Sequence, residues 1–177
     1  MPSVSSIRWP SIRSWLLLFP FCFVTVAFAL PPFALVSASQ FNTPRAKVTF
    51  ADATVVTAEL ATTPETQQRG LMFRKSLGER EGMLFVFETP DFRPFWMQNC
   101  LIPLDIIWID ASSAIASIAE NVPPCKLPTC DPPCASNDCP LYPPRPGTKA
   151  KYVVEVQAGF AKAHKVEVGQ KIKIEGL

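Results

Sequence analysis

The sequence predicts a mostly β fold of the α+β class, a compact barrel-like sheet with two short helices. Three observations predict it. Short runs rich in β-branched and aromatic residues recur along the chain, several of them lack polar alternation as strands buried on both faces do, and helix signals are confined to two short stretches. We divide the 177 residues into a secretory signal peptide (1–38), a linker (39–45) and one β-rich domain (46–177) with a Pro/Cys-rich loop at 121–148.

The N-terminal segment has the features of a cleavable secretory signal. Arg8 and Arg13 give it a positive start, no acidic residue occurs before Asp52, and an apolar run extends from residue 15 to residue 36. Val36-Ser37-Ala38 then supplies the small residues that a signal peptidase accepts. We therefore expect an extracytoplasmic protein, either periplasmic or secreted.

The alternative is a retained membrane anchor, because an apolar run of this length can cross a bilayer. Pro20 and the pair Pro31-Pro32 interrupt the run and argue against a continuous helix. An uncleaved segment would be the protein's membrane contact, and the domain would still be delivered across the membrane.

The domain is expected to begin with two strands and a helix. Residues 46–51 and 54–61 are β-branched runs, which predict a hairpin or two sequential strands. Thr63-Pro64-Glu65 places an N-cap, a proline at the first helical position and an acid in the first turn. The helix should extend to about Leu77, although Gly70 lies inside it and glycine disfavours helix interiors.

Compact apolar runs predict the remaining strands. In the last of them two lysines alternate with Ile172 and Ile174, which predicts that the isoleucines face inward. A second short helix is expected at 158–164. The further strands are expected at residues 83–87, 95–98, 104–109, 114–119, 152–156 and 171–174.

The loop at 121–148 has its own composition. It contains nine prolines and four cysteines, spaced C-x4-C-x3-C-x4-C, and proline excludes it from the interior of a sheet. In an exported protein such a cluster predicts disulfides. Of three connectivities we favour Cys125–Cys139 with Cys130–Cys134, the outer bond stabilising by about 3 kcal/mol. The alternative is a four-thiolate metal site, although the tight C-x2-C pairs usual for zinc are missing.

Charge and residue inventory exclude several classes of function. Arg8 and Arg13 account for the formal net charge of +2, so the rest of the chain has 15 basic and 15 acidic residues. This balance argues against nucleic acid as a partner. With His164 as the only histidine, a His-rich zinc site or metalloprotease motif is excluded. We predict no cofactor and no metal.

Cys100 is the odd cysteine of the domain. It could act as a nucleophile, with His164 as the only imidazole available to it. A free cysteine in an apolar run is more often a small buried hydrophobic residue, and we favour that interpretation.

Polar residues embedded in apolar runs form the densest cluster of motifs. The segments are Gly70–Arg74 (GLMFR), Gly82–Phe87 (GMLFVF), Phe95–Asn99 (FWMQN), Ile102–Asp105 (IPLD), Val153–Gly159 (VVEVQAG) and Val168–Gly169. Together they resemble the motifs of domain-of-unknown-function family 192, small bacterial and archaeal proteins that are often exported. The resemblance extends over residues 46–175 and implies a compact, β-rich single domain without an established activity.

The chain departs from the family pattern at two places. Cys100 stands where the pattern usually has threonine. The cysteine loop is longer than the family's short version, P-C…C-P-L-Y, which matches here at Pro124-Cys125 and at Cys139–Tyr142. The resemblance therefore supports the outer pairing of Cys125 with Cys139.

The motifs supply a candidate ligand pocket formed by Arg74, Trp96, Asn99, Asp105 and Glu155. An arginine fork binds a carboxylate or phosphate, and a tryptophan stacks on a sugar or another ring. The structural alternative is that Arg74 pairs with Asp105 or Glu155 and that Asn99 caps a turn, because buried charges and amides need partners.

We therefore expect a non-catalytic extracytoplasmic binding module whose partner is a small ligand, a glycan or an envelope protein. The alternative is a cell-envelope hydrolase acting on glycans. It would use Asp105 with Glu88 or Glu155 as a carboxylate pair, which glycoside hydrolysis needs about 5–10 Å apart. A secreted assembly factor that uses the Pro/Cys-rich loop as its contact surface is a third possibility.

Overall fold

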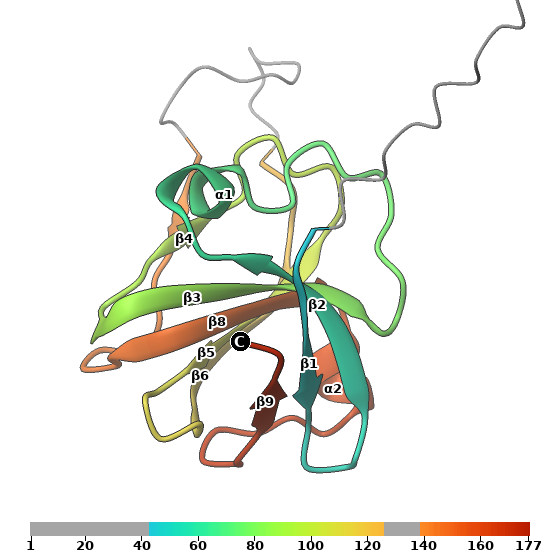
Figure 1. Cartoon of the computed structure of the whole chain (residues 1–177). Helices are drawn as coiled ribbons and strands as arrows, with labels where there is room; N and C mark the ends of the chain where they lie inside the picture. Colours follow the sequence, from blue (N-terminus) through green and yellow to red (C-terminus); the bar gives the residue numbers. More distant parts are fainter. Residues whose placement is uncertain (1–42, 126–138) are drawn as a thin grey trace, which may run out of the picture. The chain divides into compact units, whose positions relative to one another are not determined.

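The structure, a computed structural model, describes residues 43–125 and 139–177. The expected signal peptide and the expected Cys130–Cys134 bond lie outside these residues. The described chain is mostly β with two short helices, as the sequence predicts (Figure 1). In chain order the elements are β1 (Arg45–Thr49), β2 (Val55–Ala61), α1 (Pro64–Arg69), β3 (Glu81–Asp91), β4 (Phe95–Trp96), β5 (Leu104–Ile109), β6 (Ile115–Val122), β7 (Leu141–Tyr142), β8 (Ala150–Gln157), α2 (Phe160–Ala163) and β9 (Lys173–Glu175).

Seven strands form one large sheet in the order β6-β5-β8-β3-β2-β1-β9. β1 and β2 form the expected antiparallel hairpin, β2 and β3 are parallel, and α1 lies in the connection between them. The sheet is not closed into a barrel. Within the described residues, its two ends meet through the bridge between Ala114 and Lys171 and neighbouring backbone bonds such as Ile115 N–H to Gln170 O, 2.9 Å.

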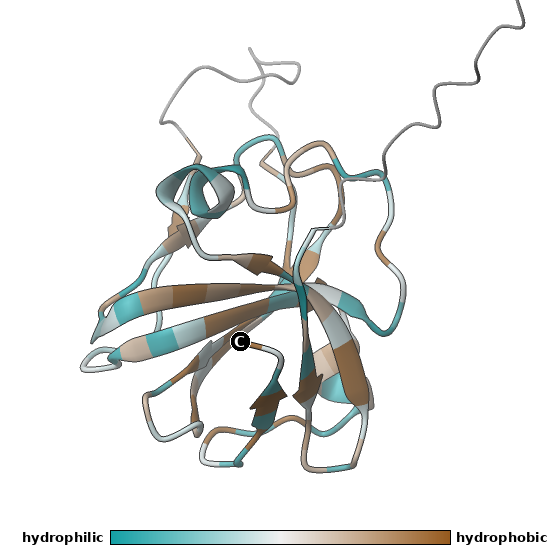
Figure 2. Ribbon diagram, viewed as in Figure 1, coloured by the Kyte–Doolittle hydropathy of each residue, from teal (hydrophilic) through white to brown (hydrophobic). Residues whose placement is uncertain are grey.

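Each face of the large sheet carries its own hydrophobic cluster. Because strand residues alternate between faces, Val154 and Val156 of β8 belong to one cluster, and Val153 belongs to the other. The first cluster includes α2, and the second packs against the segments that follow α1 and β4. Figure 2 shows the hydrophobic residues concentrated along the strands. β5 is buried throughout, as its mostly apolar sequence predicts.

The first helix is shorter than expected. It begins at the Thr63 cap, where Thr63 and Thr66 form a reciprocal capping box, and it ends at Arg69 instead of near Leu77. Gly70 adopts φ +47°, which ends the helix, and Phe73 follows with φ +62°. The glycine that disfavours a helix interior therefore stops this one.

The expected strand at 95–98 is limited to Phe95–Trp96, because residues 97–100 turn. Asn121 and Val122 belong to β6, and Leu141 and Tyr142 form β7, so four residues of the Pro/Cys-rich loop do lie in sheets, contrary to expectation. β7 pairs with β4. This second sheet has only two strands, in which proline at the ends removes few hydrogen bonds. The last strand begins two residues later than expected. Ile172 and Ile174 are more buried than Lys171 and Lys173, as expected.

Candidate functional site

Glu155 is the centre of the candidate site. It lies in the middle of β8, on the face of the second hydrophobic cluster, and is 3% exposed. Its Oε2 atom is buried and has no hydrogen-bond partner among the described residues. Gly82 of the neighbouring strand β3 permits this packing, because a Cβ there would lie 2.5 Å from the backbone oxygen of Glu155.

A small inner cavity adjoins Glu155. Its walls include Gly70, Phe85, Trp96 and Cys100. Its volume, counted as the space open to the centre of a water molecule, is about 30 Å³. A water needs roughly 10–15 Å³ measured this way, so the cavity holds one or two waters or one small polar group. A Cβ at Gly70 would lie 3.9 Å from Glu155 Oε2, which places the turn after α1 directly over the carboxyl group.

An outer cavity of about 260 Å³, by the same measure, shares four wall residues with the inner one, namely Gln67, Phe85, Phe95 and Trp96. We call the two cavities together the aromatic cleft. The rings of Phe85 and Phe95 meet edge to face, 4.9 Å between centroids. Gln67 Nε2 donates to the backbone oxygen of Val86 at 2.8 Å, which attaches α1 to β3 beside the cleft.

Arg93 lines the outer cavity. Its guanidinium lies 4.3 Å from the centre of the Phe87 ring, and its Nη2 donates to the backbone oxygen of Thr89 at 3.1 Å. The indole of Trp108 donates to the Arg93 backbone oxygen at 2.7 Å, which fixes the main chain there. Arg93 Nε and Glu155 Oε2 are the two buried side-chain nitrogen or oxygen atoms without a partner in the described chain, and both belong to residues of the cleft.

Burial controls the protonation of the two titratable groups at the inner end. It raises the pKa of Glu155 to about 8, so the carboxyl group is mostly neutral at pH 7. Burial, and to a smaller extent the charge of Glu155, raises the pKa of Cys100 to about 12. The thiol therefore stays protonated, whereas a nucleophilic cysteine needs a lowered pKa.

The structure brings together two of the five predicted pocket residues, Trp96 and Glu155. Asn99 lies in the adjacent turn with φ +55°, where its backbone oxygen accepts the Phe73 N–H at 2.8 Å. Its side-chain Nδ2 lies 3.8 Å from the sulfur of Met72. Arg74 is placed differently from both expectations, because it forms an ion pair with Glu59 of β2 and not with Asp105 or Glu155.

Asp105 lies on the opposite face of the sheet from Glu155. It is opposite Val156 in the β5–β8 register, whereas Glu155 is opposite Ile106. Adjacent register positions point to opposite faces. The expected carboxylate pair of Asp105 and Glu155 is therefore not formed, and Glu88 is exposed on β3 and lines neither cavity.

The pattern of DUF192, a family described as an uncharacterized ACR, matches residues 46–174. The chain belongs to the DUF192 family. None of the curated proteins compared with it matches.

Two solved structures resemble this DUF192 protein. One is a protein of unknown function from Novosphingobium aromaticivorans, 33% identical, covering 73% of this chain and 83% of that one at a TM-score of 0.60. The other is described as a putative transcription regulator from Sinorhizobium meliloti, 30% identical, covering 75% of this chain and 94% of that one, also at 0.60.

Three DUF192 motifs meet at the cleft. Gly70 of the first, Phe85 of the second and Trp96 of the third all line the inner cavity. Cys100, which stands where the DUF192 pattern usually has threonine, lines it too and is buried and unbonded. The departure from the pattern is therefore inside the candidate site.

The disulfide between Cys125 and Cys139, which resemblance to the DUF192 pattern supports, is present in the structure. The N–H of Cys125 donates to the backbone oxygen of Met97 at 3.4 Å, in the turn that carries Cys100. This hydrogen bond attaches the start of the Pro/Cys-rich loop to one wall of the cleft.

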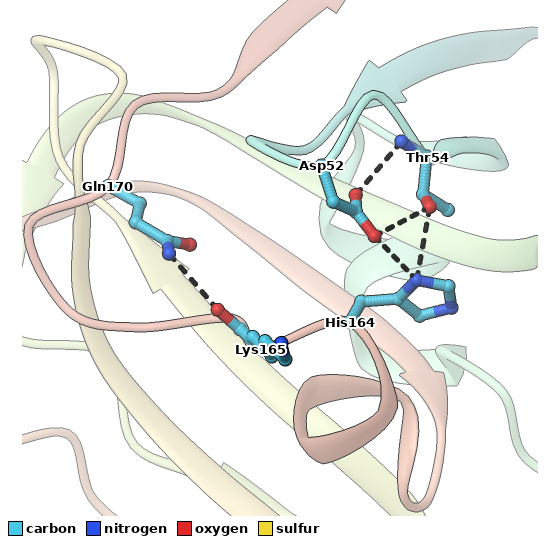
Figure 3. Close-up of polar contacts among 5 residues, drawn as sticks. All are labelled: Asp52, Thr54, His164, Lys165 and Gln170. Atoms are coloured by element: carbon cyan, nitrogen blue, oxygen red, sulfur yellow. Dashed lines mark hydrogen bonds and ion pairs between the residues drawn. The ribbon is translucent and has the colours of Figure 1, made fainter.

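The single histidine lies elsewhere. His164 Nδ1 is 2.8 Å from Asp52 Oδ2 and 3.0 Å from Thr54 Oγ1, at the β1–β2 turn (Figure 3). Its ring packs on Phe160, a member of the first cluster, whereas Cys100 belongs to the second. The two residues therefore cannot act as a cysteine–histidine pair.

Within residues 43–125 and 139–177, no group of three or more His, Cys, Asp or Glu side chains could hold a metal ion. No helix in the same parts of the chain is long and apolar enough to span a bilayer.

Several cleft residues escaped the sequence reasoning. Arg69, Arg93 and Gln98 line the cleft, and none of them was a candidate. Gln98 and Arg69 lie within or next to the motifs, so motif membership could have indicated them. Arg93 follows the long strand β3, and only the fold places it beside Phe87.

Proposed function

We propose that this DUF192 protein is an exported, non-catalytic module that binds a small ligand in the aromatic cleft. The observation that carries the proposal is the pair of buried, unpartnered atoms, Glu155 Oε2 and Arg93 Nε, in one aromatic-walled cleft. Leaving a buried polar atom without a hydrogen bond costs about 1–3 kcal/mol. A ligand that bonds both atoms offsets that cost, and concave apolar sites with a few polar groups are typical ligand sites.

Three features support binding over catalysis. Glu155 is the only carboxyl group among the residues that line the described cleft, so acid–base work by two carboxylates has no second member. The Cys100 thiol is protonated. His164 is on the opposite face of the sheet and cannot activate it.

Two features support export. The N-terminal 38 residues have the pattern of a secretory signal. The Cys125–Cys139 disulfide agrees with it, because disulfides persist in oxidising compartments and are rare in the cytosol. The balanced charge of residues 39–177 gives no support to a nucleic-acid partner.

Thermal-shift screening with small polar and aromatic fragments tests the binding proposal. A ligand that binds only the native state raises the melting temperature. We expect fragments that do so to lose their effect in Glu155→Leu and to keep it in His164→Ala, a control beside a separate cavity of about 350 Å³. Fragments that stabilise both variants equally, or no stabilising fragment at all, would contradict the proposal.

Mass spectrometry of the protein recovered from cell fractions tests export. We expect a chain that begins at Ser39 outside the cytoplasm, with Cys125 and Cys139 protected from alkylation until a reductant is added. An intact N-terminus on cytosolic protein, with every thiol alkylated without reduction, would be the opposite result.

A further inference from the structure

The aromatic cleft carries a positive charge in an otherwise balanced domain. The charged residue types on its walls are Arg69, Arg93 and Glu155. Neither arginine has a carboxylate within ion-pair distance in the described chain, whereas Arg45 and Arg74 both pair with Glu59. Burial keeps Glu155 mostly neutral at pH 7, so it does not cancel the arginine charges.

The walls of the outer cavity suit a ring. Phe87, Phe92, Phe95 and Trp96 surround it, and Phe92 is 46% exposed. Aromatic side chains pack favourably on the faces and edges of other rings. The Arg93 guanidinium lies over Phe87 and donates from Nη2 to the Thr89 backbone oxygen, and its buried Nε–H has no partner in the described structure.

We propose that the ligand of the cleft is a small ring-bearing carboxylate. Its carboxylate pairs with Arg93, its ring packs against Trp96, and a polar substituent of the ring bonds to Glu155 at the inner end. Arg69, exposed at the inner cavity, adds to the attraction for the anion. This inference rests on the proposed binding function and specifies the class of ligand.

Benzoate and benzamide are the matched probes, because they share the ring and differ in charge. The protein is the full chain as recovered from its host after any processing. Binding is followed by NMR titration of the Trp96 indole N–H, assigned with Trp96→Phe. We expect benzoate to bind at least about tenfold more tightly than benzamide, since charge-assisted hydrogen bonds are roughly twice as strong as neutral ones.

The arginine variants complete the test. We expect Arg93→Gln to lower the affinity for benzoate to that for benzamide. Arg80 is exposed and lies outside both cavities, so Arg80→Gln should leave both affinities unchanged. If Arg93→Gln does not fold, Arg69→Gln at an exposed position should lower the affinity for benzoate severalfold and leave the affinity for benzamide unchanged. Rising salt should weaken benzoate alone.

Two failures have different meanings. If benzamide binds at Trp96 as tightly as benzoate, the inferred anionic ligand is wrong and the proposed binding function still stands. The same holds if neither the arginine variants nor salt changes the affinity for benzoate. If neither probe nor any fragment of the thermal screen moves the Trp96 signal, the inference and the proposed function both fail.

Discussion

Two buried carboxyl groups on neighbouring strands have opposite surroundings. Asp105 on β5 is fully buried and accepts three backbone N–H groups, from Asn121 at 2.8 Å, Gly159 at 3.2 Å and Ala161 at 2.8 Å. Glu155 on β8 is 3% exposed, and its Oε2 has no partner in the described chain. They face opposite sides of the same sheet.

The difference separates a structural carboxylate from one that is available to a ligand. Asp105 joins the end of β6 and the start of α2 to β5, so its hydrogen-bonding capacity serves the fold. Glu155 holds no other segment through a hydrogen bond of its side chain in the described residues, and it faces a cavity. Both come from the motif cluster, and only the three-dimensional environment distinguishes them.

Removing Asp105 should have the largest effect. Asp105→Ala leaves three backbone N–H groups, one buried and two partly buried, without their acceptor, and we expect it to lower the free energy of unfolding by about 4 kcal/mol. Asp105→Asn keeps one oxygen and should cost less. Urea unfolding followed by circular dichroism measures both. If Asp105→Ala lowers the free energy of unfolding by less than about 1 kcal/mol, the hydrogen bonds of Asp105 contribute little to the fold.

The contribution of Glu155 to stability should depend on pH. Its pKa is about 8 in the folded protein, above its usual value of 4.5, so it stabilises the fold below pH 4.5 and loses that contribution as the pH rises through about 8. Glu155→Gln cannot ionise. We expect the variant to match the parent below about pH 4.5 and to become more stable than the parent as the pH rises, by roughly 2 kcal/mol near pH 6 and by a few kcal/mol near pH 9.

Urea unfolding of both proteins across this pH range makes the measurement. Glu167→Gln, at an exposed glutamate, is the matched control and should leave the pH profile of the parent unchanged. Parallel profiles for the parent and Glu155→Gln would mean that Glu155 is ionised and hydrated in the folded protein, which would remove the contrast with Asp105.

The sequence predicted the fold better than the site. Apolar runs locate most strands, because burial on both faces requires them, and the buried β5 is the clearest case. The α1 boundary was wrong because helix periodicity does not show that Gly70 adopts a positive φ. Trp96 and Glu155 were found from motifs, whereas Asp105 was assigned to the pocket because a sequence does not state which face of an unseen sheet a residue occupies.

The predicted ion-pair partners of Arg74 were wrong for a related reason. Its partner Glu59 lies on β2, and the parallel β2–β3 pairing that brings the segments together is a long-range feature. Sequence spacing offered Asp105 and Glu155 as the nearest buried acids among the motifs. Arg93 shows the same limit, since nothing in its local sequence places it over Phe87.

Arg74 should contribute moderately to stability and not to the cleft. Its side chain is 35% exposed and that of Glu59 is 15% exposed, so solvent screens the pair only in part. We expect Arg74→Ala to lower the free energy of unfolding by about 1 kcal/mol and to leave fragment binding intact. A double-mutant cycle with Glu59→Ala isolates the pair energy. Lost binding with retained stability would return Arg74 to the site.

The smallest effect is expected at a third carboxylate, Asp52, which is exposed and held by near neighbours. The backbone N–H of Thr54 and the His164 side chain lower the pKa of Asp52 to about 2 (Figure 3). A lowered pKa stabilises the fold above the usual value of 3.8, and this contribution is lost as the pH falls through about 2. Unlike Glu155, Asp52 therefore favours the folded state as an anion.

His164→Ala separates the two causes. Because the Thr54 N–H is the larger cause and survives the substitution, we expect the pKa of Asp52 to rise only part of the way towards 3.8, as measured by NMR of its side-chain carboxyl carbon. The melting temperature at pH 7 should barely change, since the group is exposed. A complete return to 3.8 would mean that His164 holds Asp52.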